Sequence, residues 1–394
     1  MNDTAPLQRI AIVGAGPVGL AFACAAAEAL PNAALWLFDA RPIDGARRED
    51  ARALALSLGS IQWLRRLQAW PAQEAEAMTE VSVSQLAPGR CDLRLRAAEL
   101  GEPMLGAVLH YAALQQTLQR RWLALAQNAP QRCVTRGGQA AGKAKPLPDG
   151  RVELEVGDGT VEPFDLVVVA EGGVFAEQRA HDWRRDYAQT AWVGELRLGQ
   201  DWPRGLAMER FTRDGPLAVL PLPDDAQGRR ASLVWCLRPD DPGVTLARLQ
   251  ALLPRSLAGC VTAFGVAPRP FALGLNADPH PLHGRSLRLG NAAQALHPVA
   301  GQGLNLGLRD AYELLVQLGH AADGRWPLDA ALQRWVARRR PDRLALLATT
   351  DLLARAFTWQ AAPLALAREA GLRTLAALPW ARHALARGLM FGLR

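Results

Sequence analysis

The fold is decided near the amino terminus, where residues 9–19 read RIAIVGAGPVG. The apolar run 9–13 ends at a glycine and predicts a short buried strand. Residues 17–30 are rich in alanine and predict a helix, and residues 34–38 predict a second strand that closes on Asp39. A strand, a glycine turn, a helix and a second strand make one right-handed βαβ unit.

The glycine spacing in this unit is typical of a dinucleotide-binding turn. Gly14 permits a tight turn after the strand, Gly16 lets the backbone approach a pyrophosphate, and Gly19 lets the helix pack closely on the strand. The helix N-terminus offers free N–H groups and a partial positive charge to phosphates. Asp39 follows Gly19 by 20 residues, where a carboxylate accepts hydrogen bonds from a ribose. Because strand, helix and acidic residue accompany the glycines, dinucleotide binding is favoured over a purely structural turn.

A second glycine-rich segment lies far downstream, where residues 287–310 read LRLGNAAQALHPVAGQGLNLGLRD. This segment resembles the ribityl- and flavin-ring-binding segment of the aromatic-hydroxylase flavoproteins. Within them it is most similar to the ubiquinone-biosynthesis hydroxylases of the 2-polyprenyl-6-methoxyphenol hydroxylase type. Residues 50–57 resemble the family's arginine-bearing segment beside the FAD phosphates, and residues 165–172 its strand that ends in an acidic-glycine pair. Residues 215–222 and 232–235 resemble its substrate-domain strands.

The resemblance implies an FAD-binding α/β fold, in which a Rossmann-type domain is interleaved with an antiparallel-sheet substrate domain and followed by C-terminal helices. The expected FAD-binding segments are 1–75, 105–180 and 285–340. The expected substrate-domain segments are 76–104 and 181–284, and residues 341–394 form a helical, Arg-rich region. The implied FAD-binding residues are Gly14, Gly16, Gly19, Asp39, Arg52, Glu171, Gly172, Gly290, Asn291, Gly301, Gln302, Gly303, Leu304 and Asn305.

The downstream segment can also be interpreted from its chemistry. Gly301-Gln302-Gly303 before a helix predicts a second N-terminus that favours negative charge, suited to the pyrimidine end of a reduced flavin. Asn291 can hydrogen-bond a ribityl hydroxyl, and Pro298 offers an apolar surface against a ring. His297 in the same segment either handles protons or is a structural histidine. His297 and Pro298 are the candidate catalytic residues.

Some candidate positions allow two interpretations or depart from the wider family. Arg52 is either a phosphate or gate contact or a surface arginine, and His110 and Tyr111 lie at a helix entry that faces the cofactor in the family pattern. Glu171 stands where the family usually has Asp, and Val174-Phe175 follow Gly173 in place of small and serine residues. Asn291 also replaces an Asp, but asparagine is typical of the polyprenyl methoxyphenol hydroxylase type.

The implied activity is an FAD-dependent monooxygenase that hydroxylates the aromatic ring of a polyprenyl phenol in ubiquinone biosynthesis. The chemistry needs reduced flavin, O2 bound as a flavin hydroperoxide, and a dry pocket. The sequence has no second glycine-plus-acid unit for a nicotinamide, so NAD(P)H or a redox protein would donate electrons transiently. The alternatives are a flavin hydroxylase or oxidoreductase acting on another aromatic substrate, and a non-catalytic scaffold of a biosynthetic complex.

Composition limits the location and the partners. The five cysteines are scattered without metal-ligand spacing, which indicates a reduced, cytoplasmic protein with no metal site. The residues before the first strand carry no apolar leader, and no stretch is long enough to span a membrane. The net charge is +7, and the last segment, from Arg325, has twelve arginines against four acidic residues. Because no nucleic-acid motif accompanies this charge, an anionic membrane surface or an acidic protein partner is favoured.

Two apolar sets lie in the Arg-rich region. We expect the first to pack on the flavin domain, and it comprises Leu344, Leu347, Leu352, Leu353 and Phe357. The second either packs inward or lies on a membrane or partner, and it comprises Leu375, Leu378, Trp380, Leu385, Leu389 and Phe391. A polyprenylated substrate resides in lipid, so membrane contact would serve the reaction.

Overall fold

The computed structural model describes residues 8–46, 50, 52–85, 92–157, 159–172, 183–298, 301–356 and 362–393. Four sequence-based expectations fall outside these residues. They concern the start of the chain at 1–7, Cys91, the departure at Val174-Phe175, and Phe357.

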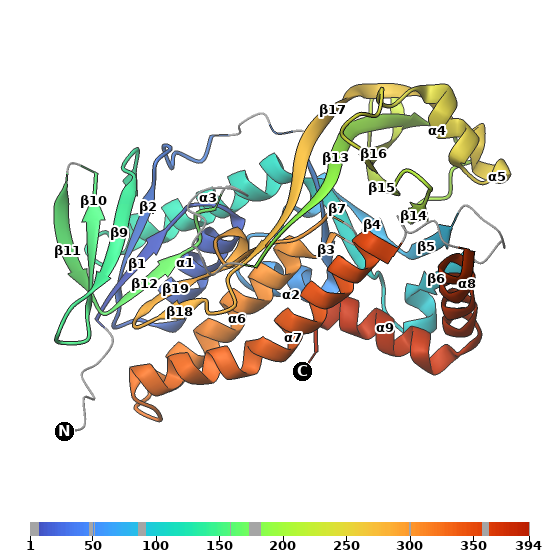
Figure 1. Cartoon of the computed structure of the whole chain (residues 1–394). Helices are drawn as coiled ribbons and strands as arrows, with labels where there is room; N and C mark the ends of the chain where they lie inside the picture. The colour runs from blue at the N-terminus through green and yellow to red at the C-terminus, as the bar shows by residue number, and fades with distance from the viewer. Residues whose placement is uncertain are drawn as a thin grey trace.

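In the described part of the chain, the first βαβ unit forms the centre of a six-stranded, mainly parallel sheet with the order β18-β19-β12-β1-β2-β8. Strands β1 and β12 pair in parallel, and the β12 residues Leu166, Val167 and Val168 are completely buried, as their continuous apolar run predicts. Helices α1, α3, α6 and α7 pack beside this sheet (Figure 1). The bounds are β1 (Arg9–Val13), α1 (Pro17–Ala29), β2 (Ala34–Asp39), α3 (Tyr111–Asn128), β8 (Cys133–Gly137), β12 (Leu166–Val169), β18 (Leu282–His283), β19 (Ser286–Arg288), α6 (Gly303–Ala322) and α7 (Leu328–Ala356).

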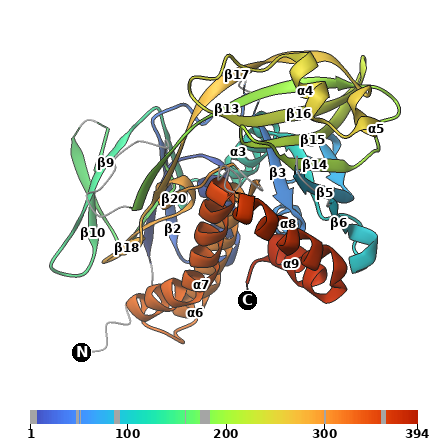
Figure 2. The ribbon, with the colours of Figure 1, turned by 45° about the vertical axis from the view of Figure 1, so that its right-hand side comes forward.

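The second large sheet has eight strands in the order β20-β17-β13-β16-β15-β14-β5-β6. It is antiparallel except where β5 runs parallel to β14. One face packs with the short helices α4 and α5 around the buried Trp235. The long strands β13 and β17 extend from this sheet toward the parallel sheet (Figures 1 and 2). The bounds are β5 (Glu80–Gln85), β6 (Asp92–Arg96), β13 (Trp183–Leu198), β14 (Leu206–Phe211), β15 (Pro216–Asp225), β16 (Gly228–Leu237), α4 (Leu246–Leu252), α5 (Arg255–Ala258), β17 (Val261–Ala277) and β20 (Gln294–Ala295).

Two three-stranded sheets complete the described strands. The sheet β3-β7-β4 lies between the two large sheets, and the sheet β11-β10-β9 lies at the outer end of the molecule. Residues 137–150, which the sequence predicts to be a loop or hairpin tip, contain the strand β9. The Gly and Lys residues of this segment do not predict a strand. The strand forms because the segment pairs with β10. The bounds are β3 (Ala53–Ser57), α2 (Leu58–Arg66), β4 (Ala75–Met78), β7 (Gly106–His110), β9 (Ala141–Pro146), β10 (Val152–Val156) and β11 (Thr160–Phe164).

The C-terminal region is helical, as expected, and continues from α7 into α8 (Ala362–Ala377) and α9 (Pro379–Phe391). Of the first apolar set, Leu347 is buried, whereas Leu352 is 51% exposed and Leu344 is also exposed, so inward packing is wrong for these two residues. They lie on the outer side of α7, where no described element covers them.

Helices α8 and α9 cover an apolar cluster that includes Leu93 and Leu95 of β6. From the second apolar set, Leu375, Leu385, Leu389 and Phe391 pack against this cluster. Leu378 and Trp380, at the turn between the two helices, remain exposed. Inward packing therefore holds for most of the set, and only the helix turn presents apolar side chains to the outside.

The sheets draw on separated parts of the sequence, because β5 and β6 join the large antiparallel sheet while β18 and β19 join the parallel one. We propose that the two domains interleave along the boundaries given above.

The described cysteines, Cys24, Cys133, Cys236 and Cys260, are free and buried. The described residues contain no group of potential metal ligands. None of the described helices is both long and apolar enough to cross a bilayer.

Candidate functional site

Glycines bring three strands into backbone contact at their carboxyl ends. Gly14 has a φ of +104°, and a Cβ there would lie 2.5 Å from the backbone nitrogen of Glu171, which follows β12. A Cβ on Gly172 would lie 2.7 Å from the backbone nitrogen of Ala292, which follows β19. A Cβ on Gly19 would collide with the carbonyl oxygen of Gly14. These glycines are therefore required by packing, in the manner that the sequence predicts for Gly19.

The two glycine-rich segments meet at Val18. A Cβ on Gly290 would lie 3.0 Å from Cγ2 of Val18, and a Cβ on Gly307 would lie 2.8 Å from the same atom. Helix α1 of the first motif is thus in direct contact with the start of α6 and with the turn after β19. Because the segments are about 270 residues apart in sequence and adjacent in space, one extended ligand can contact both.

Gly16 and Gly303 have a different environment, since protein packing does not require either of them to be glycine. Among the described residues, the nearest atom to a Cβ on Gly16 would be the hydroxyl of Tyr111 at 3.9 Å, and no atom would lie within 4 Å of a Cβ on Gly303. Gly16 is extended (φ −75°) and precedes α1, while Gly303 begins α6, and neither helix start has a side-chain cap. The free N–H groups and the open space beside them fit the pyrophosphate and the pyrimidine ring of FAD.

The carboxylate of Asp39 lies beside the first turn. It is buried, and its oxygens accept hydrogen bonds from the backbone nitrogens of Ala15 and Arg41, each at 2.8 Å. Asp39 also lines a narrow crevice of about 160 Å³ with Tyr111 and Gln115. Asp39 therefore shapes the glycine turn and at the same time faces the space that an adenosine ribose would occupy.

A polar side chain at this crevice has unused hydrogen-bonding capacity. The side-chain amide of Gln115 donates a hydrogen bond to the carbonyl of Ala15. Its buried Oε1 has no hydrogen-bond partner among the described residues. A buried acceptor of this kind is costly unless a ligand or water satisfies it. The first glycine turn thus offers both donors and an acceptor to a bound dinucleotide.

Arg52 lies at the rim of the same crevice. Its guanidinium pairs with Asp50, at 2.6 Å between Nη2 and Oδ2, and lies 4.7 Å from the centre of the Tyr111 ring. Burial raises the pKa of Tyr111, so its hydroxyl remains protonated. His110 lies beside Glu195, with 3.5 Å between Nε2 and Oε1, and so joins the β3-β7-β4 sheet to the antiparallel sheet. A phosphate contact by Arg52 stays a prediction.

The remaining sequence-predicted cofactor residues are distributed around this crevice and the second glycine segment. The side chains of Glu171 and Asn291 are exposed, and their backbones make the close contacts with the glycines. Leu304 packs partly against the main core. The charge of Glu171 is therefore not part of the strand contact.

Asn305 is the anchor of the second glycine segment. Its side-chain amide donates to the carbonyls of Ala55 (2.9 Å) and Gly301 (3.1 Å). Its Oδ1 accepts from the backbone nitrogen of Ser57 and the hydroxyl of Ser60, each at 2.8 Å. These four hydrogen bonds occupy the donors and the acceptor of the Asn305 side chain. The predicted contact of Asn305 with the cofactor would therefore be made by its backbone N–H, in the first turn of α6.

Gln302 lies directly before α6, and a buried network of charged side chains positions it. Its Oε1 accepts from Nη2 of Arg309 at 3.3 Å, and Arg309 also lies 3.4 Å from Asp342. Arg339 bridges Asp342 and Asp310, with both contacts at 2.6 Å. These ion pairs are buried, and through Arg309 they fix the position of Gln302 at the start of α6.

His297 is buried and lies between α6 and the antiparallel sheet. Its Nε2 lies 2.8 Å from Oε1 of Gln189, and its ring meets that of Tyr187 edge-on at 5.0 Å. Both partners come from an irregularity in β13 where Ala188 has a φ of +48°. This bulge turns Tyr187 and Gln189 toward His297. Burial lowers the pKa of His297 to about 4, so the ring is neutral near pH 7.

A cavity of about 360 Å³ opens beside the second glycine segment. Pro298, Gly301 and Gln302, which the sequence predicts to contact the flavin ring, form one part of its wall. The rest of the wall is mainly apolar and comes from the antiparallel sheet, the β3-β7-β4 sheet and helices α7, α8 and α9. Its apolar members include Val81, Val83, Leu93, Leu95, Leu105, Ala218, Leu220, Val234, Leu346, Leu353, Leu372, Leu375, Leu385 and Leu389.

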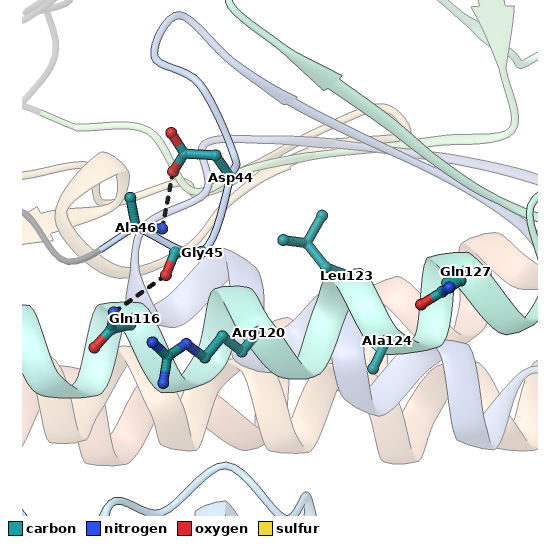
Figure 3. Close-up of a pocket in the computed structure, with 8 residues that line it drawn as sticks. All are labelled: Asp44, Gly45, Ala46, Gln116, Arg120, Leu123, Ala124 and Gln127. Atoms are coloured by element: carbon teal, nitrogen blue, oxygen red, sulfur yellow. Dashed lines mark hydrogen bonds between the residues drawn. The ribbon is translucent and has the colours of Figure 1, made fainter.

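A second, wide-open hollow lies on the outer side of α3 (Figure 3). Gln116 donates to the carbonyl of Gly45 at 3.2 Å, and Asp44 accepts from the backbone nitrogen of Ala46 at 3.0 Å. Ala46 lines both this hollow and the Asp39 crevice. The hollow is therefore an outer neighbour of the crevice.

Sequence reasoning missed three residues of this site. Gln115 lies one turn after Tyr111 on α3, so helical spacing from a named candidate could have found it. Arg309 directly precedes Asp310 in the quoted segment, but its contact with Gln302 depends on α7. Gln189 carries no sequence signal, because the irregularity in β13 between Asp186 and Thr190 decides the direction of its side chain.

Comparison with known proteins gives consistent results. A family model described as an FAD binding domain matches residues 280–349. The ubiquinone hydroxylase UbiL of Rhodospirillum rubrum is 32% identical, in an alignment that covers 92% of this chain and 85% of the relative. The 3-demethoxyubiquinol 3-hydroxylase of Escherichia coli is 31% identical, covering 92% of this chain and 93% of the relative.

Solved structures share the fold at low sequence identity. HpxO of Klebsiella pneumoniae, complexed with FAD and uric acid, has a TM-score of 0.70 at 16% identity and covers 98% of this chain and 96% of its own. The p-nitrophenol 4-monooxygenase PnpA of Pseudomonas putida has a TM-score of 0.72 at 16% identity and covers 98% and 99%. The predicted fold class and the predicted FAD cofactor are confirmed.

Replacing Gly16 by valine separates cofactor binding from folding. Because no described atom would lie closer than 3.9 Å to a Cβ on Gly16, we expect G16V to fold with a melting temperature close to that of the wild-type apoprotein but to bind no FAD. The measurement is the flavin absorbance of the purified protein together with thermal denaturation of the apo forms. The control G19V meets the Gly14 carbonyl and should lose stability; a yellow, FAD-saturated G16V would contradict the assignment.

Titration of His297 should contribute to the pH dependence of stability. The unfolded chain protonates His297 below about pH 6.5, whereas the folded protein does so only near pH 4. The folded state binds fewer protons in this window, so its stability is full above pH 6.5 and falls by roughly 3 kcal/mol toward pH 4. Urea unfolding of wild type and H297N from pH 7 to 4 should show their difference shrinking as the pH falls. Parallel curves would show that His297 is not the titrating group.

Proposed function

The chain belongs to the FAD-dependent hydroxylases of ubiquinone biosynthesis, and we propose that it hydroxylates the aromatic ring of a polyprenyl phenol on that pathway. The single observation that carries this proposal is the apolar cavity of about 360 Å³ that begins at Pro298 and Gly301. A phenol ring placed at that end lies next to the expected flavin ring. A prenyl tail would then extend along the leucines of β6, α8 and α9.

The protein's own residues bind, orient and exclude water. The N–H groups at the starts of α1 and α6 and the Asp39 carboxylate would hold FAD, which supplies the oxygen-transfer chemistry when reduced in the presence of O2. NAD(P)H or a redox protein would donate the electrons. The cavity leucines and valines exclude water from the reacting ring.

We propose that His297 acts by position. The neutral imidazole is held between Gln189 and Tyr187, and it fixes the adjacent Pro298 at the cavity wall. Its burial favours this role over proton handling, since the imidazole does not line the cavity.

The two rival functions make different demands on the same structure. A hydroxylase or oxidoreductase for a small soluble aromatic would not need the long leucine-lined part of the cavity. A scaffold without FAD would not need the open, uncapped helix starts at Gly16 and Gly303. Both features favour a flavoenzyme with a lipophilic substrate.

Quinone-intermediate profiling tests the pathway assignment. A strain that lacks this protein should accumulate an intermediate missing one hydroxyl group, and wild-type protein but not G16V should restore the profile. The purified, yellow enzyme should form the hydroxylated product from that intermediate when given a reductant and O2. An unchanged quinone profile in the deletion strain would overturn the proposal.

We also propose that the cytoplasmic protein docks on an anionic membrane through the turn between α8 and α9. Trp380 is 70% exposed there and Leu378 is exposed beside it, while two exposed arginines lie on the same two helices: Arg387, and Arg373, which is paired with Glu369. Exposed tryptophan flanked by arginine suits the interface between headgroups and acyl chains. Because the inner faces of the same helices line the cavity, docking would bring a lipid-dissolved substrate close to its site. A biosynthetic protein complex is the alternative partner for this turn.

Vesicle sedimentation tests the docking surface. We expect wild type to bind vesicles that contain anionic phospholipid, and a variant carrying both L378A and W380A to bind about tenfold or more weakly because of the lost apolar burial. The control W183A removes an exposed tryptophan from β13, outside helices α8 and α9, and should bind as wild type does. Equal binding by wild type and the double variant would contradict this surface, and capture by a pathway enzyme instead of vesicles would favour the complex.

A further inference from the structure

The cavity wall formed by the antiparallel sheet carries an acidic side chain. Along β14, Leu206 and Met208 belong to the core on the far face of the sheet. Side chains alternate along a strand, so Ala207, Glu209 and Phe211 belong to the opposite face, and all three line the cavity. The register of the strand therefore directs the side chain of Glu209 into the space proposed for the substrate.

The neighbours of Glu209 across the sheet are apolar. It pairs with Val83 on β5 and with Ala218 on β15, and Ala218 pairs with Val234 on β16. All three neighbours line the same cavity. The strand register therefore places one carboxylate in a part of the cavity wall that is otherwise apolar, where a polar group of the substrate can meet it.

Glu209 differs in its acid–base chemistry from the polar groups that share the cavity wall. Among the described lining residues it is the one carboxylate, and none of them is basic. The polar side chains beside it are amides and hydroxyls, which do not exchange a proton near pH 7. They belong to Ser57, Gln302, Asn305, Thr349 and Thr350. Glu209 is therefore the cavity group whose chemistry suits the acceptance of a proton from a phenol.

The position of Glu209 along its strand suits a single aromatic ring. A Cβ on Gly215, in the turn after β14, would lie 3.6 Å from Nε2 of Gln189, and Gln189 bonds His297 next to Pro298. The turn begins at Thr212, three residues after Glu209. At the rise per residue of an extended strand, the distance along the strand between these two residues is roughly 10 Å. A phenol between Glu209 and the flavin-ring segment would thus contact the carboxylate with its hydroxyl and present its ring to the flavin end.

We propose that Glu209 is a catalytic residue that binds the phenolic hydroxyl of the substrate and accepts its proton. This assignment rests on the proposed function and names the group that activates its substrate. As the O–H proton passes to the carboxylate, the ring becomes electron-rich at its ortho and para carbons, and a ring electron pair forms the new C–O bond to one oxygen atom of O2. The O–O bond breaks, and the second oxygen atom leaves as water after taking up two electrons from the electron donor and two protons. The attacked carbon then loses its hydrogen as H+ to solvent, and the Glu209 carboxyl returns its proton to the original oxygen. In sum, the phenol, O2, two electrons and two protons give the hydroxylated phenol and water.

The test compares E209Q and E209D with wild type on a short-chain 2-prenyl-6-methoxyphenol and on its methyl ether, which lacks the hydroxyl. Ligand binding is followed by the change in flavin absorbance, and product formation by chromatography. We expect wild type to bind the phenol about tenfold or more tightly than the ether, and E209Q to lose this preference. We expect product formation to fall about 100-fold in E209Q and to recover in part in E209D, in line with general-base catalysis.

A matched control removes a carboxylate from the same sheet. Glu80 lies on β5 with its side chain bonded to Arg94 and Arg96, so E80Q should retain the wild-type preference and rate. Flavin content and melting temperature of E209Q must match wild type, which separates chemistry from folding. If E209Q keeps both the preference for the phenol and the rate, the assignment to Glu209 is wrong while the proposed function stands. If wild type forms no product from the phenol, the proposed function fails, and the binding comparison still decides whether Glu209 recognises the hydroxyl.

Discussion

Backbone-to-backbone contact at the carboxyl ends of β1, β12 and β19 is the constraint on which the rest of the molecule depends. At Gly14, Gly19 and Gly172 the neighbouring chain lies where a side chain would otherwise begin. This close approach brings α1 onto the parallel sheet and allows Val18 to contact Gly290 and Gly307. Without it, the two glycine-rich segments would not be neighbours in space, and a single dinucleotide could not contact both.

The buried charge network connects the start of α6 to the C-terminal residues that follow α9. Arg309, Arg339, Asp310 and Asp342 pair with one another, and the backbone nitrogen of Leu393 donates to Asp342 at 3.0 Å. The same charged group thus holds the start of α6 and the end of α9. Buried ion pairs add little net stability, but breaking one leaves an uncompensated charge, so they favour one arrangement of these helices. The flavin-facing segment and the helices that cover the cavity are thereby held in a fixed relation.

Local patterns in the sequence were sufficient to predict the strands and the helix that carry the first glycine segment, whereas the cofactor contacts of its residues stay predictions. The apolar run before Gly14 and the apolar run at 166–169 predicted β1 and β12, because buried parallel strands need nothing beyond such runs. The resemblance of residues 287–310 to flavin hydroxylases predicted the second segment, and the relatives confirm the family. The sequence did not decide whether α8 and α9 pack inward, since an apolar helix face looks the same whether it covers a cavity or a membrane. Gln189 and Glu209 escaped prediction because a bulge in β13 and the register of β14 decide where their side chains point.

The central claim is that one FAD joins the two glycine-rich segments and presents its ring to the apolar cavity. The most direct measurement is the experimental structure of the FAD-loaded enzyme. The account predicts one FAD per chain, with its pyrophosphate at the start of α1, its ribose at Asp39, and its ring system between Pro298 and the first turn of α6. An FAD bound elsewhere, or a ring system directed away from the cavity, would contradict the account.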